Sequence, residues 1–254
     1  MLRILISNDD GIHSLGIYQL ANSLSSIGKV IVVAPESERS ASGHSITMHK
    51  PLRSKSVDFF GKDIEAWCIN GTPSDCIKFA LQSLLKEKPN LIVSGINHGS
   101  NLGTDVLYSG TVSAAVEGAI NGIPSIALSL CCHDNCDFKP YAKISSILCK
   151  QLYDNGIEKG IVININFPYI PKEELKGIRI TSLGVRRYRN CFVERKDPRG
   201  NSYYWLAGEL EDEENSEDTD VNSINNKYIS ITPIKIDLTS HEMINKMREW
   251  ELKI

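Results

Sequence analysis

Short apolar runs alternate with longer amphipathic segments over the first two-thirds of the chain. The apolar runs are rich in branched side chains and cover residues 2–7, 30–34, 91–94, 125–130 and 161–167. Runs of this kind are typical of parallel strands that are covered on both faces. Segments 16–27, 74–86 and 111–121 have helical spacing, and Gly122 and Pro124 end the last one. This order predicts an α/β fold with a doubly wound, mostly parallel sheet.

The pattern changes after residue 168. Segments 177–182, 191–195 and 203–207 are short and strand-like, and the sequence DPRG at 197–200 fits a hairpin turn between the last two. The chain closes with a strand at 228–236 and a helix from Ser240. We therefore predict a core at 1–168 that carries the site, and an appendage at 169–254 made of a β-hairpin, a strand and a helix.

Two features of this appendage concern its surface. Residues 209–220 contain eight acidic side chains and few apolar ones, which predicts a solvated or mobile loop. The closing helix has Met243, Ile244, Met247 and Trp250 at helical spacing. Such an apolar stripe is more typical of packing or subunit contact than of a ligand site.

Composition limits the classes of partner. The chain has 254 residues, of which 41% are hydrophobic, so it can bury a full core. A formal net charge of -3 gives no overall field that would attract nucleic acid or an anionic membrane, and we expect neither as a partner. The first apolar run is too short for a secretory signal or a spanning helix, so we expect a cytoplasmic protein.

The seven cysteines are odd in number and irregularly spaced, which argues against a disulfide framework and predicts reduced thiols. Cys131, Cys132, His133 and Cys136 suggest a cluster for a soft metal ion. They follow an apolar run directly and have no second matching pair, so a zinc site is the less favoured interpretation.

Polar side chains follow three of the apolar runs. In an open parallel sheet, the carboxyl ends of the strands meet at one edge, where ligands bind at the topological switch point. We therefore expect these side chains to lie close together. They are Asn8, Asp9 and Asp10 after the first run, Glu38, Arg39, Ser40, Ser42, Gly43 and His44 after the second, and Asn97, His98 and Asn101 after the third.

Asp9 and Asp10 are adjacent carboxylates, which repel each other unless a cation lies between them. The alternative is a solvated turn that Gly11 completes. With a hydroxyl and an amide oxygen from the other runs, the pair forms an all-oxygen set, which suits Mg²⁺, Mn²⁺ or Ca²⁺ better than zinc or copper. Such a site keeps coordination positions open for water and a phosphate oxygen.

A candidate phosphate cradle precedes the helix at 111–121. Ser109, Gly110 and Thr111 are small enough for the backbone to approach an anion, and the free N–H groups of the helix start would face it. The alternative is a plain N-cap, with Ser109 or Thr111 as the capping residue. The segment lacks the Gly-Lys-Ser/Thr ending of a P-loop.

Five motifs in one order resemble the SurE family, the stationary-phase survival protein with nucleotidase activity. Together they cover the first half of the chain densely. They are ILISNDDG at 4–11, VAP at 33–35 with ERSASGHSIT at 38–47, NGTPSDC at 70–76, SGIN at 94–97, and YSGTVSAA at 108–115. The second half matches more loosely, through RRY at 186–188 and Asp220 with YISITP at 228–233.

The resemblance implies a Rossmann-like core that is a divalent-metal-dependent 5'-nucleotidase, with one metal ion per subunit, most simply Mg²⁺ or Mn²⁺. Nucleoside monophosphates would be the substrates, and 3'-nucleotidase and exopolyphosphatase activities are further expectations. The family's metal ligands fall on Asp9, Asp10, Ser40 and Asn97, and its phosphate lies beside Asn101 and residues 109–111. The resemblance also implies a homodimer or homotetramer, in which subunits exchange the C-terminal hairpin. His98 stands where other members often have Arg.

The expected mechanism is metal-assisted hydrolysis of a phosphomonoester by water, with the cradle and His44 stabilising charge on the phosphoryl oxygens. Asp9 and Asp10 are the candidate catalytic residues, each as a ligand, a general base or a nucleophile. We favour a ligand for one and a ligand that is also the base for the other. The Asp-x-Asp spacing of haloacid-dehalogenase-type phosphatases, which use an Asp nucleophile, is absent.

Two other classes of function remain open. A receiver-like signalling module also holds Mg²⁺ with an acidic pair after its first strand, but Asn97 stands where its phospho-accepting Asp is needed, and the chain is about twice as long. A protein that binds Mg²⁺ and nucleotide without turnover would keep the same site. Arg186, Arg187 and Arg189 fit either a solvated strand edge or contact with substrate or a partner subunit.

Overall fold

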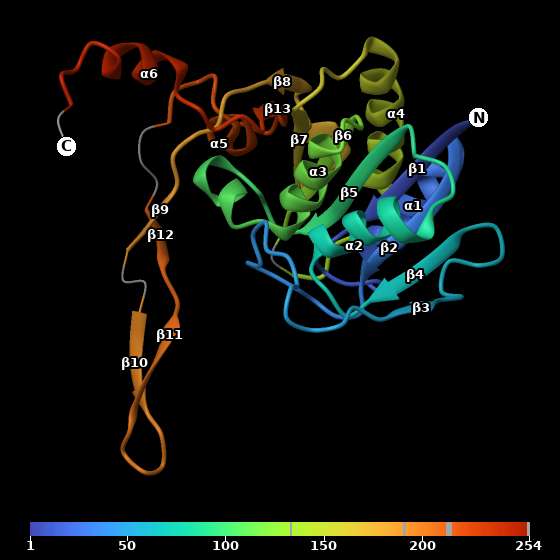
Figure 1. Cartoon of the computed structure of the whole chain (residues 1–254), viewed down its shortest axis with the longest axis horizontal. Helices are drawn as coiled ribbons and strands as arrows, with labels where there is room; N and C mark the ends of the chain where they lie inside the picture. Colours follow the sequence, from blue (N-terminus) through green and yellow to red (C-terminus); the bar gives the residue numbers. More distant parts are fainter. Residues whose placement is uncertain (133, 190–191, 212–214, 253–254) are drawn as a thin grey trace.

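Among the residues that the computed structural model describes, 1–132, 134–189, 192–211 and 215–252, a nine-stranded sheet forms the centre of the chain. Figure 1 shows this sheet with helices on both sides and a long ribbon that extends away from it. The strands, in their order across the sheet, are β3 (Ser54–Ser56), β4 (Glu65–Ile69), β2 (Gly28–Pro35), β1 (Leu2–Ser7), β5 (Leu91–His98), β6 (Ser125–Cys131), β7 (Ile161–Pro168), β13 (Ile229–Lys235) and β8 (Ile178–Ile180).

The six central strands are parallel, in the order β4-β2-β1-β5-β6-β7. From β1, the chain first adds β2 and β4 on one side of the sheet and then β5, β6 and β7 on the other. This is the order of a Rossmann-like sheet, and its switch point lies between β1 and β5. The doubly wound fold predicted from the sequence is confirmed.

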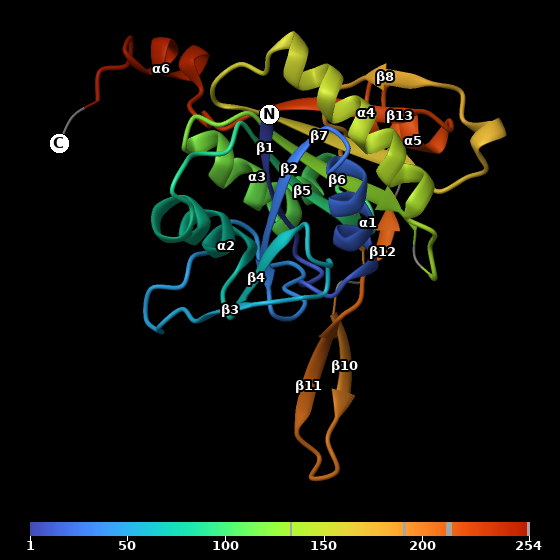
Figure 2. The same ribbon diagram turned by 90° about the vertical axis from the view of Figure 1, so that its right-hand side faces the viewer.

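Alternate side chains of each central strand face opposite helical layers. Ile4 and Ile6 pack towards α1 (Leu15–Leu24) and α4 (Lys139–Asn155). Leu5 packs into a second cluster with α2 (Pro73–Phe79) and α3 (Gly110–Ile120). Figure 2 shows α1 and α4 on one side of the sheet and α2 and α3 on the other. Coverage on both faces explains why the strands are apolar throughout.

Two elements of the core were not predicted, the strand β4 and the helix α4. The helix α4 is less apolar overall than α1 and α3, and its buried face includes Ala142, Ser145, Ser146 and Cys149. The strand β4 has only five residues, of which only Ala66 and Ile69 are buried. Both elements therefore lack the long apolar pattern that revealed their neighbours.

The segment after residue 168 contributes both to the sheet and to a projecting arm. The strand β13 pairs antiparallel with β7, and β8 pairs parallel with β13. The arm consists of two ribbons, β9 (Arg187–Arg189) with β12 (Glu209–Glu211), and β10 (Phe192–Lys196) with β11 (Ser202–Leu206). Figure 1 shows the second ribbon extending well beyond the body. The predicted C-terminal hairpin is confirmed.

Two short helices complete the chain, α5 (Asp220–Asn225) and α6 (His241–Met247). Met243, Met247 and Trp250 of the predicted apolar stripe are all exposed to solvent. Among the described residues, no helix has both the length and the apolar character needed to cross a bilayer.

The prediction of a solvated loop at 209–220 is wrong at both ends of the segment. Glu209–Glu211 form β12, which pairs with β9. Asp220 is fully buried, and its carboxylate accepts hydrogen bonds of 2.8 Å from the backbone N–H groups of Gly103, Gly184 and Val221. A charged side chain is buried here because backbone donors from three segments converge on it. Residues 212–214 lie outside the described residues.

The prediction of reduced thiols is wrong for one pair, because Cys132 and Cys136 form a disulfide. The number and spacing of the cysteines do not reveal this pair, because the bond depends on how the short loop after β6 folds. Cys68, Cys76, Cys131 and Cys149 are free, and His133 and Cys191 lie outside the described residues.

Candidate active site

The predicted strand-end residues meet at the switch point of the sheet. Asp9 and Asp10 follow β1 after Asn8, and Asn97 lies near the end of the neighbouring strand β5. The register between β5 and β6 shifts between Ser94 and Asn97, a bulge of the kind often found beside active sites. At Gly95 a Cβ atom would lie 2.3 Å from the carbonyl oxygen of Leu128, so the bulge requires glycine.

Thr111, the second residue of α3, joins two of the predicted metal ligands. Its hydroxyl donates a hydrogen bond to the carboxylate of Asp9 and lies 3.4 Å from Oδ1 of Asn97. Asp9 and Thr111 are buried and Asn97 is partly buried. Three side chains from β1, β5 and α3 therefore present oxygen atoms to one place.

Asp10 sits between Asp9 and His98. Its Oδ2 accepts a hydrogen bond of 3.1 Å from the backbone N–H of His98. Burial, followed by the negative charge of Asp9, raises the pKa of Asp10 to about 7. Burial also raises the pKa of Asp9, against the effect of the hydrogen bond from Thr111. Buried carboxyls with raised pKa values are often found at functional sites.

The loop after β2 brings Ser40 and Ser42 to the same edge. The backbone N–H of Arg39 donates to the carbonyl of Asp9 at 2.7 Å, and that of Gly43 donates to the carbonyl of Tyr108 at 3.0 Å. Ser40 is exposed and its hydroxyl donates to Oε1 of Glu38. The loop is thereby fastened to both the end of β1 and the start of α3.

The NGTPSDC motif fixes the far end of this loop. Asp75 accepts hydrogen bonds from the backbone N–H and the hydroxyl of Thr47, at 3.0 and 2.6 Å. The same carboxylate accepts from the N–H of Thr72, and Thr72 caps α2 in return. The motif therefore acts as a structural support for the loop that carries Ser40.

Ser109 is the N-cap of α3, since its hydroxyl accepts from the N–H of Val112 at 3.1 Å. The plain N-cap interpretation is thus correct for Ser109, whereas Thr111 contacts Asp9. A Cβ at Gly110 would lie 2.9 Å from both Oδ2 of Asp9 and Oγ of Ser42. Glycine is needed here because the carboxylate and the hydroxyl approach the helix start this closely.

Two buried polar atoms of the site have no hydrogen-bond partner among the described residues, Oδ1 of Asn8 and Oγ of Ser42. The amide of Asn8 donates to the carbonyl of Gly11 at 3.0 Å and to Oγ of Ser14 at 2.8 Å, which fixes its orientation. An unpaired buried polar atom is costly unless a ligand or water satisfies it. The residues present therefore fit a site for an oxygen-ligated cation with a bound anion beside it.

Asn101 is held rigidly by a network that sequence analysis missed. Its backbone N–H donates to Oδ1 of Asn166 at 2.9 Å, and its side-chain amide donates to Oγ of Ser129 at 2.8 Å. The carbonyl of Asn101 accepts from the amides of Asn164 and Asn166. These partners lie within otherwise apolar strands, where alternating asparagines at 164 and 166 were the available signal.

His44 contacts Glu117 of α3. Its Nε2 lies 3.0 Å from Oε2 of the buried Glu117, whose other oxygen is 3.4 Å from Nζ of Lys78. Burial alone would raise the pKa of Glu117, but the hydrogen bond from His44 and the charge of Lys78 hold it below its ordinary value. The structure thus pairs His44 with a carboxylate on α3.

A cavity of about 480 Å³ opens over this edge of the sheet. One part of its lining comes from the sheet edge and from the start of α3, and the rest comes from the arm. The lining residues are Asp9, Ser40, Ala41, Asn97, His98, Asn101, Asp105, Tyr108, Ser109, Tyr188, Leu206 and Gly208. A larger, mainly apolar cavity of about 740 Å³ lies elsewhere, between α4 and residues 168–175.

Asp105 connects the arm to this cavity and was not predicted. Its Oδ2 accepts hydrogen bonds of 2.8 Å from the guanidinium of Arg186 and from the hydroxyl of Tyr188. Arg186 also donates to Oγ of Ser100 at 3.1 Å. The RRY motif therefore anchors the base of the arm, and Arg186 is a structural contact at the rim of the site.

Comparison with known proteins identifies the family. A sequence model of the family described as "Survival protein SurE" matches residues 4–190, about three-quarters of the chain. The chain belongs to the SurE family. The SurE match includes all the predicted metal ligands and the candidate phosphate cradle, and it ends within the arm.

SurE proteins of known name are similar over nearly the whole chain. One from Alkaliphilus metalliredigens, named 5'-nucleotidase SurE, is 52% identical and covers 99% of this chain and 100% of its own. Another of that name, from Heliobacterium modesticaldum, is 47% identical and covers 98% of this chain and 92% of its own. The crystal structure of a SurE protein from Aquifex aeolicus matches with a TM-score of 0.85 at 40% identity, over 97% of this chain and 98% of that one.

Proposed function

We propose that this chain is a 5'-nucleotidase that hydrolyses nucleoside monophosphates to a nucleoside and phosphate, using one divalent cation per subunit, Mg²⁺ or Mn²⁺. Relatives that carry the name 5'-nucleotidase SurE align with nearly all of the chain at about half identity. The observation that carries the chemistry is the meeting of Asp9, Thr111 and Asn97 oxygens beside Asp10 at the switch point.

Asp9, Asp10, Ser40 and Asn97 are the residues that would hold the cation. Their donor atoms are carboxylate, hydroxyl and amide oxygens, which suit a hard cation. When bound, the cation would supply Lewis-acid activation of the phosphoryl group and of a water molecule. The raised pKa values of the two carboxyls support this assignment, because a nearby positive charge would offset their burial and stabilise the ionised carboxylates.

The phosphate would bind at the start of α3. The positive end of the helix dipole favours an anion there. Gly110 keeps the backbone close, and the unpaired hydroxyl of Ser42 faces the same space. Asn101 and Ser109 line the same cavity, and the asparagine network holds Asn101 in place. His44 would act here only by fixing Glu117 and the loop.

Asp10 is our candidate for the general base. It is the less buried of the two carboxyls, and its second oxygen is fixed by the N–H of His98. A cation beside it would lower its pKa again, so the carboxylate would be ionised at neutral pH and able to accept a proton from the attacking water. Asp9, which receives the hydroxyl of Thr111, would then serve as a ligand only.

The nucleoside would occupy the side of the cavity that the arm provides. Tyr188 and Leu206 of the arm and Tyr108 before α3 supply aromatic and apolar surface, opposite the polar sheet edge. A base stacks well on such side chains, and stacking is tolerant of base identity. One cavity that combines an anion site with an apolar wall therefore suits a nucleoside monophosphate.

A receiver-like signalling module is the less favoured alternative. Receiver domains have the strand order 2-1-3-4-5, with one strand beyond the first. Here two strands, β2 and β4, lie beyond β1 on that side, and Asn97 near the end of β5 stands where a phospho-accepting Asp would be needed. A nucleotide-binding protein would have the same site as the proposed nucleotidase but would not hydrolyse the nucleotide. The substrate test below separates the binding protein from the nucleotidase.

We also propose that the chain forms a homodimer or homotetramer through the arm. Phe192 and Trp205 are 70% and 62% exposed on the projecting ribbon. A lone two-stranded ribbon is marginally stable in water, so a second subunit is the natural cover for these side chains.

The substrate test is phosphate release from 5'-monophosphates, 3'-monophosphates and short polyphosphate, after chelation and with Mg²⁺ or Mn²⁺ restored. We expect turnover of the 5'-monophosphates, and release from the other two would extend the proposal to 3'-nucleotidase and exopolyphosphatase activity. Binding of nucleotides without release from any of them would contradict the proposal and favour the binding protein.

A further inference from the structure

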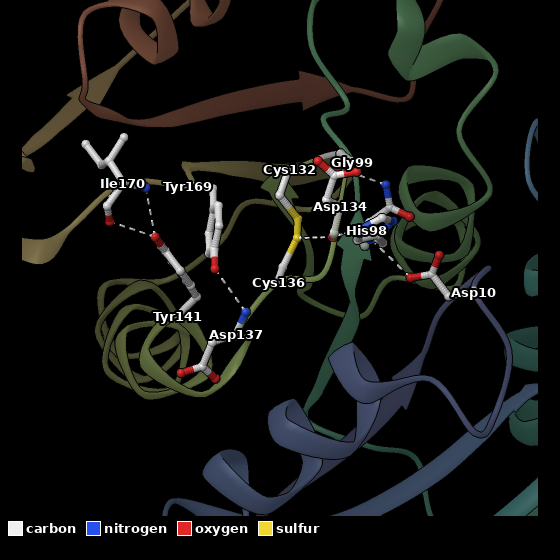
Figure 3. The surroundings of a disulfide bond; sticks show 11 residues. Asp10, His98, Gly99, Cys132, Asp134, Cys136, Asp137, Tyr141, Tyr169 and Ile170 are labelled. Carbon is white, nitrogen blue, oxygen red and sulfur yellow. Dashed lines mark hydrogen bonds between the residues drawn. A yellow bond between two sulfur atoms is a disulfide. The ribbon is translucent and has the colours of Figure 1, made fainter.

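Three side chains that prefer soft metal ions lie beside Asp10. One nitrogen of His98 and the sulfur atoms of Cys132 and Cys136 lie within 4.8 Å of one another. Figure 3 shows the disulfide between the two cysteines, with His98 and Asp10 on one side of it and Tyr141 on the other. These ligand types differ from the all-oxygen set of the proposed catalytic centre.

The backbone carbonyl of Asp134 lies beside this cluster and fixes the tautomer of His98. Nε2 of His98 lies 2.9 Å from the carbonyl oxygen of Asp134. A carbonyl only accepts, so Nε2 carries the proton and the lone pair of the ring is on Nδ1. A ligating histidine commonly donates its other N–H to a backbone carbonyl in this way, which fixes its tautomer.

The cluster is also accessible. His98 is exposed and Cys136 is half-buried, whereas Cys132 is buried. A cavity of about 300 Å³ beside them is lined by Asp10, His98, Asp134, Cys136 and Phe138, among others. A small reductant can reach Cys136, and water can occupy a fourth coordination position.

We propose that reduction of the Cys132–Cys136 bond opens a site for a soft divalent cation, with zinc as the best fit, held by both thiolates and His98. A dithiol reductant breaks the protein S–S bond and forms its own, and two electrons and two protons pass to Cys132 and Cys136. Binding of the cation then releases those two protons to solvent. Two thiolates and a neutral imidazole balance the charge of the cation, and water completes a tetrahedral site.

The site is separate from the proposed catalytic centre but adjoins it through His98. The ring of His98 belongs to the soft cluster, while its backbone N–H holds Oδ2 of Asp10 at 3.1 Å. Sulfur ligands select zinc over Mg²⁺, whereas an all-oxygen set suits a hard cation such as Mg²⁺ or Mn²⁺. The two sites can therefore bind different cations in one chain, and the soft site exists only in the reduced protein.

Cobalt absorption tests this proposal, because Co²⁺ replaces zinc and reports its ligands. Full-length protein is reduced, freed of metal by chelation and titrated with Co²⁺ without oxygen. We expect sulfur-to-cobalt charge-transfer absorption that saturates at about one Co²⁺ per chain and disappears when zinc is added. Re-forming the disulfide in the wild-type protein should abolish the absorption. This control requires no substitution.

Variants assign the ligands. Cys136→Ser should lose the charge-transfer absorption, and His98→Ala should weaken cobalt binding and change the d–d spectrum. Cys131→Ser, the neighbouring free thiol, and Asp9→Asn, in the oxygen set, should both keep it, which separates this site from the proposed nucleotidase centre. No charge-transfer absorption in the reduced wild type, or full absorption in the folded Cys132→Ser/Cys136→Ser variant, would overturn the proposal.

Discussion

The hydroxyl of Thr111 lies between Asp9 and Asn97. Its hydroxyl donates to one and lies 3.4 Å from the other, so it orients two proposed ligands at once. We predict that Thr111→Val weakens Mg²⁺ or Mn²⁺ binding about 10- to 100-fold, since losing a group that orients a ligand has this effect. Calorimetric titration of metal-free protein measures it. The exposed Thr239→Val should bind as the wild type does, and equal affinities in both variants would contradict this role.

Asp10 makes the metal-free protein sensitive to pH. Burial, followed by the charge of Asp9, raises its pKa from 3.8 to about 7. The folded state therefore binds the proton more tightly than the unfolded chain does. Proton binding by Asp10 therefore stabilises the folded state. Its contribution to the free energy of unfolding is fully present below pH 3.8 and is lost as pH rises through about 7, a change on the order of 2–4 kcal/mol.

The matching variant is Asp10→Asn, which cannot ionise. In chelator, its free energy of unfolding should change less between pH 5 and pH 8 than that of the wild type, and should exceed it at pH 8 (about 1 unit above the wild-type pKa). Urea denaturation at several pH values measures both. Parallel pH dependence in the two proteins would show that Asp10 has no raised pKa.

Residues at strand ends were predictable from the sequence, and their supporting residues were not. Asp9, Asp10 and Asn97 follow apolar runs, and topology brings such positions together. Asp105 and Asn166 act through contacts between segments more than 60 positions apart in sequence, to Arg186 and Asn101, and no local pattern encodes those pairings.

At the scale of elements, Asp220 at the start of α5 joins three segments. Its carboxylate accepts from the backbone N–H groups of Gly103 and Gly184, which lie in different loops. Asp220→Ala would leave these buried donors unpaired, so we predict a loss of about 3 kcal/mol in the free energy of unfolding. Urea denaturation measures this loss.

The control for this prediction is the nearby Asp218→Ala. Asp218 is exposed, and its carboxylate contacts Ser216 close by in the chain. We expect its unfolding midpoint to stay at the wild-type value. Equal effects of the two substitutions would mean that the acidic segment behaves as the solvated loop that composition predicts.

Element prediction succeeded where hydrophobic pattern alone decides structure. The central strands and α3 were predicted because strands covered on both faces are continuously apolar and because Gly122 and Pro124 end the helix. It failed for α4, which is less apolar overall than α1 and α3, and for the acidic segment, where distant backbone donors bury Asp220. Those outcomes depend on tertiary contacts.

At the scale of the whole molecule, the arm is the candidate interface. In the register of β10 and β11, Phe192 pairs with Leu206 and Val193 with Trp205, so Phe192 and Trp205 lie on opposite faces of the ribbon. We predict that Phe192→Ser/Trp205→Ser lowers the mass in sedimentation from an oligomer to the monomer. Lys196→Ser/Arg199→Ser on the same hairpin should remain oligomeric. An unchanged mass in the first variant would contradict an interface at the arm.

The division at residue 168 stays a prediction. The strands β8 and β13 come from the later segment and extend the main sheet, while the arm projects from the body. We propose that the functional appendage is the arm at 187–211. Sequence pattern indicated a change of character at 168, but it could not show that β13 pairs with β7.

The most direct test of the central claim is release of phosphate from a 5'-nucleoside monophosphate by chelated protein after Mg²⁺ or Mn²⁺ is restored. Wild type and the exposed-site control Asp63→Asn should recover turnover. Asp9→Asn should remain lower by more than about 100-fold, because it loses a charged ligand of the cation. Recovery of full turnover by Asp9→Asn, or turnover by the wild type that chelation does not remove, would contradict the account.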